Sequence, residues 1–473
     1  MRQKTACKRG STLPRAQTPA MIRSMTLQSA SDAFRARDDG DDKVAAAPAA
    51  HAPATLPRPH AADPNCQPAQ GDLGTSTGLN LSPGSDDDGW TVPPPVQLSD
   101  GTRIQLYKDG EALHAAYEAI KGAKKRICLE AYIFADDDTG RAFAELLSEK
   151  AQQGVRVYCI YDSIGSHGAT HLWRRTAELF NRMRRSGVRL AEFHPLRPWE
   201  GRFGWRPVNR DHRKLLHIDD DISGLGGLNV GGEYAGSWVV PSKAKECDLW
   251  RDNAMGIVGP ASRLLLQSFA QTWRYIHTGG PVKRAEFHRP LADGEFGLLA
   301  SVPSTHSELT ERLRDLLKKA RHSIELTMAY FAPPDELIEV LVKAAKRGVK
   351  VRLMLPGRGD VKILLTAARS FYEVLLPAGV EVYERQHVIL HAKTMCIDRE
   401  YTVIGSTNLD YRSIEYNLEL SALVRSKDFG QQMHDLFEND VRYAKRISLK
   451  EWRKRTLVDR FGQWVVKRAR YLL

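Results

Sequence analysis

The chain has 473 residues, enough for two domains that each bury a core, and 42% of them are apolar, as in ordinary globular proteins. No run of eighteen apolar residues occurs, so we expect no transmembrane helix. The six cysteines show no paired or Cys-x2-Cys spacing, which fits a reducing compartment and gives no sign of a structural zinc site.

Residues 1–98 are rich in Ala, Pro, Asp, Ser and Gly and poor in aromatic residues, which predicts a disordered extension. The basic residues near its start are not followed by the apolar core of a secretory signal, so none is expected. We interpret this start as an unstructured extension. A basic tail that touches anionic lipid or nucleic acid is the alternative.

Strands and helices then alternate twice in the same order, which predicts a first domain at 99–277, a linker at 278–294 and a second domain at 295–445. The first domain is expected to hold helices at 110–123, 139–153 and 170–186 and strands at 126–134, 155–161 and 188–193. The second is expected to hold helices at 307–320, 335–347 and 364–378 and strands at 323–331, 349–355 and 380–383. Such alternation indicates an α/β fold, a mainly parallel or mixed sheet with helices on both faces, once per half.

Two sets of polar residues recur at identical spacing. The second member of each pair lies 179 residues after the first: His212 and His391, Lys214 and Lys393, Asp219 and Asp398, Gly226 and Gly405, Asn229 and Asn408. A match at five offsets indicates an internal duplication. A single His-x-Lys would more often be a chance match than a functional motif. Because the pattern occurs twice at five matching offsets, the functional interpretation is favoured.

Each set reads as a hairpin, with Asp219 and Asp398 at the turns. Side chains alternate along a strand, so the histidine and the lysine of one motif point to the same side. The returning strand brings the asparagine back toward the histidine. We therefore expect a His, a Lys and an Asn from each half to converge.

This set of residues suits a phosphodiester, which needs a nucleophile, a proton for the departing oxygen and positive charge on its other oxygens. One neutral and one protonated imidazole supply the first two near neutral pH, through a phosphohistidine. The lysines and asparagines stabilise the crowded five-coordinate state. No metal or other cofactor is required.

The doubled His-x-Lys-x4-Asp with Gly-x2-Asn resembles the phospholipase D superfamily. The runs at 405–413 and 129–134, with Asn417 and Glu419, are most similar to its bacterial cardiolipin synthase branch. The resemblance begins near Ile104 and extends almost to the C-terminus. It implies two similar α/β sandwich domains, each a mixed sheet flanked by helices, related by a pseudo-twofold duplication and sharing one active site.

The resemblance also implies roles for single residues. His212 would be the nucleophile and His391 would protonate the leaving group, and the sequence alone would not decide this. Asp219 and Asp398 complete the catalytic motifs, although we expect them to pin the hairpins more than to touch substrate.

Further residues are expected around the phosphate, because a carboxylate should orient each imidazole. Glu419, twenty-eight residues after His391, is the expected partner behind that histidine. An insertion around 238–247 would make Asp252 its counterpart in the first half, while the carboxylate behind His212 stays open. Ser406 joins the substrate-binding set with both asparagines, and Gly227 stands in its place in the first half.

The function that the resemblance implies is a phosphatidyl transfer from phosphatidylglycerol or a similar phospholipid to an alcohol on a second lipid, as in cardiolipin synthase. Hydrolysis by a phospholipase D is the same chemistry with water as acceptor. A metal-independent nuclease is the next alternative, disfavoured because the basic excess lies in the tail. A catalytically inactive lipid-binding protein is disfavoured by the intact motifs. We expect a monomer with duplicated domains and no nucleic-acid partner.

The C-terminal segment at 446–473 is basic and amphipathic. The formal net charge of the chain is +12, and residues 441–473 hold 11 basic and 2 acidic side chains. Leu457, Phe461, Trp464, Val465 and Leu472 follow helical spacing. We expect this helix to lie on an anionic membrane, peripherally at the cytoplasmic side of the inner membrane. A helix packed on the catalytic domain is the alternative, and both can hold.

Overall fold

The structure is a computed structural model that describes residues 90–168, 173–195, 208–235, 250–279, 294–303 and 308–469. Most of the expected disordered extension and most of the expected linker therefore lie outside the described residues. So does the insertion expected around 238–247.

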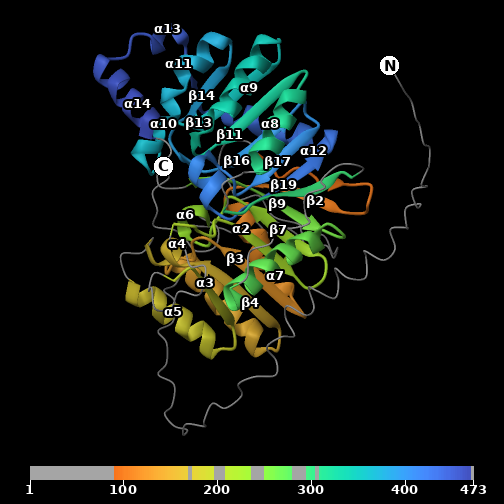
Figure 1. The fold of residues 1–473 in the computed structure, drawn as a ribbon. Coiled ribbons are helices and arrows are strands. Elements are labelled where there is room, and N and C mark those ends of the chain that lie inside the picture. The colour runs from red at the N-terminus through yellow and green to blue at the C-terminus, as the bar shows by residue number, and fades with distance from the viewer. Residues whose placement is uncertain are drawn as a thin grey trace, which may run out of the picture. The chain divides into compact units, whose positions relative to one another are not determined.

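The first half of the described chain forms an eight-stranded mixed sheet in the order β1-β2-β9-β7-β6-β3-β4-β5 (Figure 1). Its strands are β1 (Val96–Gln97), β2 (Arg103–Lys108), β3 (Arg126–Ala131), β4 (Arg156–Asp162), β5 (Arg189–Phe193), β6 (Leu215–Ile218), β7 (Ile222–Gly226) and β9 (Asn253–Val258). β3, β4 and β5 are parallel, and the remaining pairs are antiparallel. Val96 and Gln97 form the edge strand β1, so the sheet begins ahead of residue 99, where the first domain was expected to start.

The second half repeats this sheet, in the order β10-β19-β17-β16-β11-β13-β14-β20. Its strands are β10 (Phe296–Ser301), β11 (Ser323–Met328), β13 (Lys350–Pro356), β14 (Glu381–Arg385), β16 (Lys393–Ile397), β17 (Tyr401–Gly405), β19 (Glu419–Arg425) and β20 (Ala444–Arg446). Seven strands match the first sheet position by position, and each sheet adds one strand at a different edge. The predicted duplication of an α/β domain with a mixed sheet is confirmed.

Helices cover both faces of each sheet, since both faces carry apolar side chains that must leave water. The longer ones are α2 (Gly110–Gly122), α3 (Asp138–Gln152), α5 (Trp173–Arg185) and α7 (Ser262–Thr278), then α8 (Glu308–Lys319), α9 (Asp335–Lys346), α10 (Lys362–Ser370) and α12 (Lys427–Val441). The short ones are α4 (Ser163–Gly168), α6 (Gly232–Ala235) and α11 (Tyr372–Leu375), with a π-helical turn at Arg412–Tyr416. α7 and α12 each cover one face alone, opposite the other helices of their half.

The helix expected at 364–378 is instead divided into α10, α11 and a 3-10 turn at Leu376–Ala378. Pro377 has no backbone N–H to continue the helical hydrogen bonds, which favours an end at this point. Gly379 then adopts a left-handed conformation, with φ of 89°, and closes the segment.

The two halves are joined by backbone pairing beside the motifs. β8 (Trp250–Arg251) runs parallel to β15 (Ile389–Leu390), and Asp211 forms an isolated parallel bridge with Leu418. A further short pair joins β12 (Phe331–Ala332) and β18 (Leu409–Asp410) within the second half. The pairing of β15 with β8 and the bridge from Asp211 to Leu418 hold the residues before each motif against a segment of the opposite half.

The C-terminal segment forms α13 (Leu449–Trp452) and α14 (Leu457–Ala469), and α14 packs along α10 (Figure 1). Trp452 stacks obliquely on Tyr372 of the second core, with ring centroids 4.8 Å apart. One face of this segment therefore packs on the catalytic domain, which was the alternative to a helix that lies on a membrane. Within the described ranges, no helix is both long and apolar enough to span a membrane.

Candidate active site

Each His-x-Lys motif leads into a hairpin in the middle of its sheet. β6 pairs with β7, and β16 with β17, with turns at Asp219 and Asp398 as predicted. Gly226 and Gly405 end the returning strands, and a Cβ on either would overlap the backbone of the neighbouring strand. Only glycine therefore allows the strands to approach this closely, which explains why both motifs carry it.

The two histidines are buried, and each contacts a carboxylate from the other half of the chain. His212 Nδ1 lies 2.9 Å from Glu419 Oε1, and His391 Nδ1 lies 2.6 Å from Asp252 Oδ2. The expected pairing of Glu419 with His391 is wrong. Lys393 Nζ also lies 2.8 Å from His391 Nδ1. A ring that is protonated at Nδ1 donates to its carboxylate and has Nε2 as the nitrogen for chemistry.

Backbone hydrogen bonds between the halves cause this crossing. The amide of His212 donates to the carbonyl of Leu418 at 2.9 Å, and the amide of His391 donates to the carbonyl of Arg251 at 2.8 Å. In each case the carboxylate is the next residue after the accepting carbonyl. A histidine that docks on the opposite strand therefore meets that strand's carboxylate.

The halves differ beside these carboxylates. Ser406 Oγ donates to Glu419, whereas a Cβ on Gly227 would overlap the carboxylate of Asp252. The longer glutamate is thus combined with a serine and the shorter aspartate with a glycine. The amides of Gly227 and Ser406 both donate to the carbonyl of the residue after the carboxylate, so Asp252 is the counterpart of Glu419, as the sequence predicted.

Both motif lysines are buried within the same site. Lys214 Nζ donates to the His212 carbonyl at 2.7 Å, and Lys393 Nζ donates to the His391 carbonyl. Burial lowers the pKa of Lys214 to about 7 and that of Lys393 to about 8. An anionic phosphate would favour the charged form of both ammonium groups and raise both pKa values.

Burial and the two lysines also act on the histidines. The pKa of each histidine is lowered well below its usual value, first by burial and then by the charges of Lys214 and Lys393. Burial raises the pKa of Glu419 to about 7 and that of Asp252 to about 6. Because both lysines act on both histidines, the two motifs form one electrostatic site.

The two asparagines are fixed by their side-chain oxygens. Asn229 Oδ1 accepts from the amide of Ile133 at 3.0 Å, and Asn408 Oδ1 accepts from the amide of Tyr330 at 3.3 Å. Asn229 Nδ2 also donates to the hydroxyl of Tyr234 at 2.7 Å. Each asparagine therefore has its NH₂ group as the donor that a phosphate oxygen can use.

Asp219 and Asp398 do not join this cluster. The carboxylate of Asp219 accepts from the backbone amides of residues 124–126, and that of Asp398 from those of residues 321–323. Both side chains lie at the hairpin turns, with φ near 53°. Their geometry joins the hairpin to the start of β3 or β11, as expected for residues that pin the hairpins, and we propose a structural role for both.

Asp219→Ala is expected to lower the free energy of unfolding by about 1–3 kcal/mol, because three backbone donors lose their acceptor. Activity per folded molecule should be retained. Chemical denaturation and an assay corrected for the folded fraction measure the two effects. Asp220→Ala is the matched control, since its exposed ion pair with Lys125 contributes little to stability. A loss of turnover without a loss of stability would instead make Asp219 catalytic.

Several residues near the histidines were not assigned from the sequence. The ring of Tyr132 lies 4.9 Å from that of His212, and the ring of Trp250 lies 4.7 Å from that of His391, between centroids. The charge of Arg412 also contributes to the lowered pKa of His212. Tyr132 lies in the run at 129–134 and Trp250 lies two residues before Asp252. The sequence therefore drew attention to both positions, but it did not predict that their rings face the histidines.

The strand that carries Asp252 is fixed by a buried ion pair between the halves. The guanidinium of Arg251 donates to both carboxylate oxygens of Asp440, at 2.9 and 2.8 Å. Arg385 also contacts Asp440, at 3.4 Å. Because α12 carries Asp440, this helix of the second half holds the backbone beside His391.

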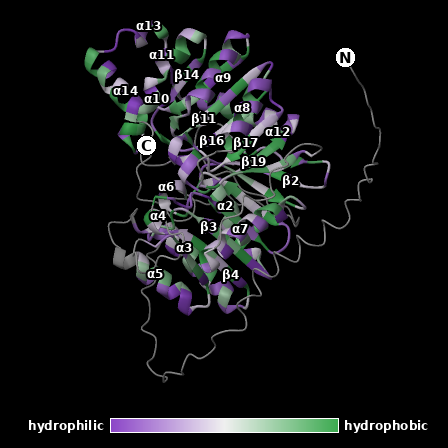
Figure 2. Cartoon of the chain, viewed as in Figure 1, coloured by the Kyte–Doolittle hydropathy of each residue, from purple (hydrophilic) through white to green (hydrophobic). Residues whose placement is uncertain are grey.

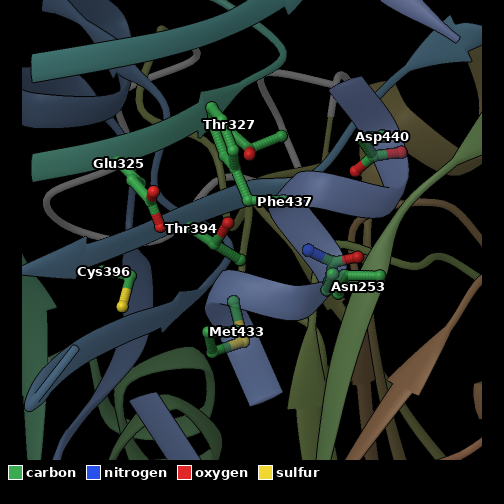
Figure 3. A pocket seen from close by; sticks show the side chains of 9 residues that line it. Asn253, Glu325, Thr327, Thr394, Cys396, Met433, Phe437 and Asp440 are labelled. Atoms are coloured by element: carbon green, nitrogen blue, oxygen red, sulfur yellow. The ribbon is translucent and has the colours of Figure 1, made fainter. Parts of the chain in front are cut away.

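A pocket lies between the second sheet and α12, and Glu325 is one of the residues that line it (Figure 3). Other titratable side chains surround Glu325. His434 Nδ1 lies 3.0 Å from Glu325, and Glu438 is close enough to complete a set of three cation ligands. Arg352 already donates to both carboxylates, at 3.1 Å to Glu325. Its guanidinium supplies the positive charge, so we describe this group as an ion-pair network.

Two equivalent α/β domains that bring two histidines and two lysines into one site define a duplicated enzyme with a single shared active centre. Comparisons with known proteins agree with this class. Residues 313–441 match the family model described as "Cardiolipin synthase, PLD-like domain".

Two curated relatives carry the same name. The chain is 33% identical over 379 residues to a cardiolipin synthase of Geobacillus kaustophilus (strain HTA426), covering 78% of this chain and 72% of that protein. It is 32% identical over 368 residues to cardiolipin synthase A of Pseudomonas syringae pv. syringae (strain B728a), covering 77% and 74%. The chain belongs to the phospholipase D superfamily, in its cardiolipin synthase branch.

A solved structure shares the fold. The phosphatidylserine synthase of Haemophilus influenzae Rd KW20 superposes with a TM-score of 0.57 at 14% identity, covering 80% of this chain and 97% of that one. At this identity the likeness concerns the fold alone.

Proposed function

We propose that this protein is a cardiolipin synthase, a phosphatidyltransferase that works through a phosphohistidine. The observation that carries the proposal is the pair of buried histidines, each held by a carboxylate of the opposite half and each contacted by the lysine of its own motif. A single chain provides every one of these groups. We therefore propose that a monomer is sufficient for activity.

In the first step, Nε2 of His212 attacks the phosphorus of the donor lipid, phosphatidylglycerol or a similar phospholipid. The bond from phosphorus to the head-group oxygen breaks, and this oxygen takes the Nε2 proton of His391. In the second step, His391 accepts the proton of a hydroxyl on the acceptor lipid. The acceptor oxygen attacks phosphorus, the phosphorus–nitrogen bond breaks and His212 is regenerated.

The remaining residues stabilise charge during both steps. Lys214, Lys393 and the NH₂ groups of Asn229 and Asn408 would hold the non-bridging oxygens, and the loss of one such donor typically costs about 2.7–4 kcal/mol in the transition state. Glu419 and Asp252 fix the ring orientation and favour each imidazolium as it forms. Water as acceptor would make the same site a phospholipase D, so transfer and hydrolysis are distinguished only by the product.

The test is an incubation of purified protein with labelled phosphatidylglycerol, and separately with single-stranded DNA, both with saturating chelator. We expect labelled cardiolipin, because lysine and asparagine supply the charge that a metal would otherwise provide. Phosphatidic acid as the sole product would indicate hydrolysis. DNA cleavage without lipid turnover would indicate a nuclease.

Metal independence gives a separate prediction. Turnover in saturating chelator is expected to stay within about twofold of that without chelator, since we propose that four buried side chains donate to the phosphate. Full loss that added Mg²⁺ or Zn²⁺ restores would contradict it. Preincubation of the enzyme with chelator controls for slow release of a bound ion.

We also propose that the enzyme works at the cytoplasmic surface of an anionic inner membrane, since both proposed substrates are membrane lipids. The basic C-terminal segment supports this location, because basic side chains near an anionic surface are worth about 1 kcal/mol each.

A further inference from the structure

α14 carries an unusual share of the exposed apolar surface. Ten large apolar side chains are counted as exposed among the described residues, and five of them lie on this one helix. These five are Leu457, Val458, Phe461, Trp464 and Val465, with exposed fractions from 43% to 80%. Apolar patches of this kind on a soluble protein usually mark an interaction surface.

The five side chains share one face. At about 100° per residue they span about 120° of the helix, whereas Val466 points to the opposite side. Val466 packs against the second core, and Lys467 Nζ lies 5.4 Å from the centre of the Phe371 ring. Hydrophobic and hydrophilic residues accordingly alternate along α14 in Figure 2. The inner face holds the helix on the domain, and the outer face is left to another partner.

Positive charge borders the outer face. Four exposed cationic residues lie on α14 or just before it: Arg453, Lys454, Arg460 and Arg468. The guanidinium of Arg468 lies 4.3 Å from the centre of the Trp464 ring, on the apolar face itself. Apolar side chains, a tryptophan and flanking cations are the composition of a helix that lies in the interface of an anionic bilayer.

The helix on which α14 packs begins at the edge of the active site. Asp360, two residues before α10, accepts a hydrogen bond from the hydroxyl of Tyr330 at 2.6 Å. The amide of Tyr330 in turn donates to Asn408. The carboxylate of Asp360 also acts on the pKa of Lys393. A surface on α14 is therefore connected through one helix to the groups proposed to hold phosphate.

We propose that the outer face of α14 is the surface by which this enzyme docks on an anionic bilayer, so that α10 and the edge of the site meet the lipid. This inference rests on the proposed function for its substrate, but the docking itself does not require turnover. The five apolar side chains enter the interface and the flanking cations meet lipid phosphates.

The experiment compares vesicles of phosphatidylglycerol with vesicles of phosphatidylcholine by sedimentation. The triple variant Leu457→Ser, Phe461→Ser, Trp464→Ser should bind phosphatidylglycerol vesicles at least about tenfold more weakly than the unmodified protein. The matched control Leu457→Val, Phe461→Leu, Trp464→Phe keeps the face apolar and should bind within about twofold of it. Binding of the unmodified protein should weaken with salt, since exposed charges are screened within about 10 Å at 0.1 M.

Two further measurements keep the outcome clear. Turnover of detergent-dispersed phosphatidylglycerol by the serine variant should equal that of the unmodified protein, because the changed residues are exposed and lie outside the site. Quenching of fluorescence by brominated phosphatidylglycerol should fall in Trp464→Phe, a variant that stays folded if the serine variant does not.

Undiminished sedimentation of the folded serine variant would overturn the proposal. So would a change from dimer to monomer in light scattering with vesicle binding unaltered, because a second copy would then cover the face. If the unmodified protein binds vesicles but turns over no lipid in detergent, docking stands and the proposed function fails.

Discussion

His212→Ala and His391→Ala are each expected to reduce turnover by at least about 10⁴-fold while the fold remains intact. The reason is that neither histidine can replace the other. His212 must bond to phosphorus, and His391 must give a proton to the first leaving oxygen and take one from the acceptor. Steady-state assays on both lipids, with circular dichroism to check folding, measure the effect.

His322→Ala is the control for this pair, because His322 is exposed and its backbone amide contributes the hydrogen bond to Asp398. Its turnover should be unchanged. Rapid denaturation at neutral to alkaline pH during turnover should leave the labelled phosphatidyl group on His212, because a phosphorus–nitrogen bond is labile in acid. Label on His391 would reverse the two roles. Near-normal activity of either alanine variant would remove that histidine from the mechanism.

The second large effect concerns the crossed carboxylates. Glu419→Gln and Asp252→Asn are each expected to lower kcat/KM by about 10²–10⁴-fold, since an amide no longer favours the imidazolium or the required tautomer. A carboxylate raises the pKa of the imidazole that it contacts, so its loss lowers that pKa. The pH profile therefore reports which histidine each carboxylate contacts.

The direction of each change follows from the roles. His212 acts unprotonated, so a lower pKa in Glu419→Gln moves the acidic limb of kcat/KM to lower pH. His391 acts protonated, so a lower pKa in Asp252→Asn moves the alkaline limb to lower pH. If each carboxylate instead contacted the histidine of its own half, Glu419→Gln would move the alkaline limb and Asp252→Asn the acidic limb. Glu415→Gln, in the π-helical turn before Glu419, should leave both limbs in place.

The sequence by itself determined the duplication and the chemical groups. Two histidines and two lysines at a constant offset of 179 residues require two equivalent hairpins, since side-chain direction along a strand depends only on local spacing. The alternation of helices and strands likewise predicted both sheets, because apolar periodicity is a local property. Even the displaced carboxylate Asp252 was found by counting through an insertion.

The tertiary structure decided which carboxylate meets which histidine. That choice depends on β8 of one half pairing with β15 of the other and on the bridge between Asp211 and Leu418. Such pairing joins residues more than a hundred positions apart and leaves no trace in the local pattern.

The same distinction applies to Asp219 and Asp398 and to α14. Each aspartate follows its lysine at the spacing of the motif, but the strand between them separates the aspartate from the histidine. Only the folded hairpin turn shows which backbone amides donate to its carboxylate. The apolar periodicity of α14 predicted one apolar stripe. In the structure the apolar residues of α14 lie on two faces, because the second core contacts the side with Val466. The remaining apolar side chains are exposed, and their burial requires a second surface.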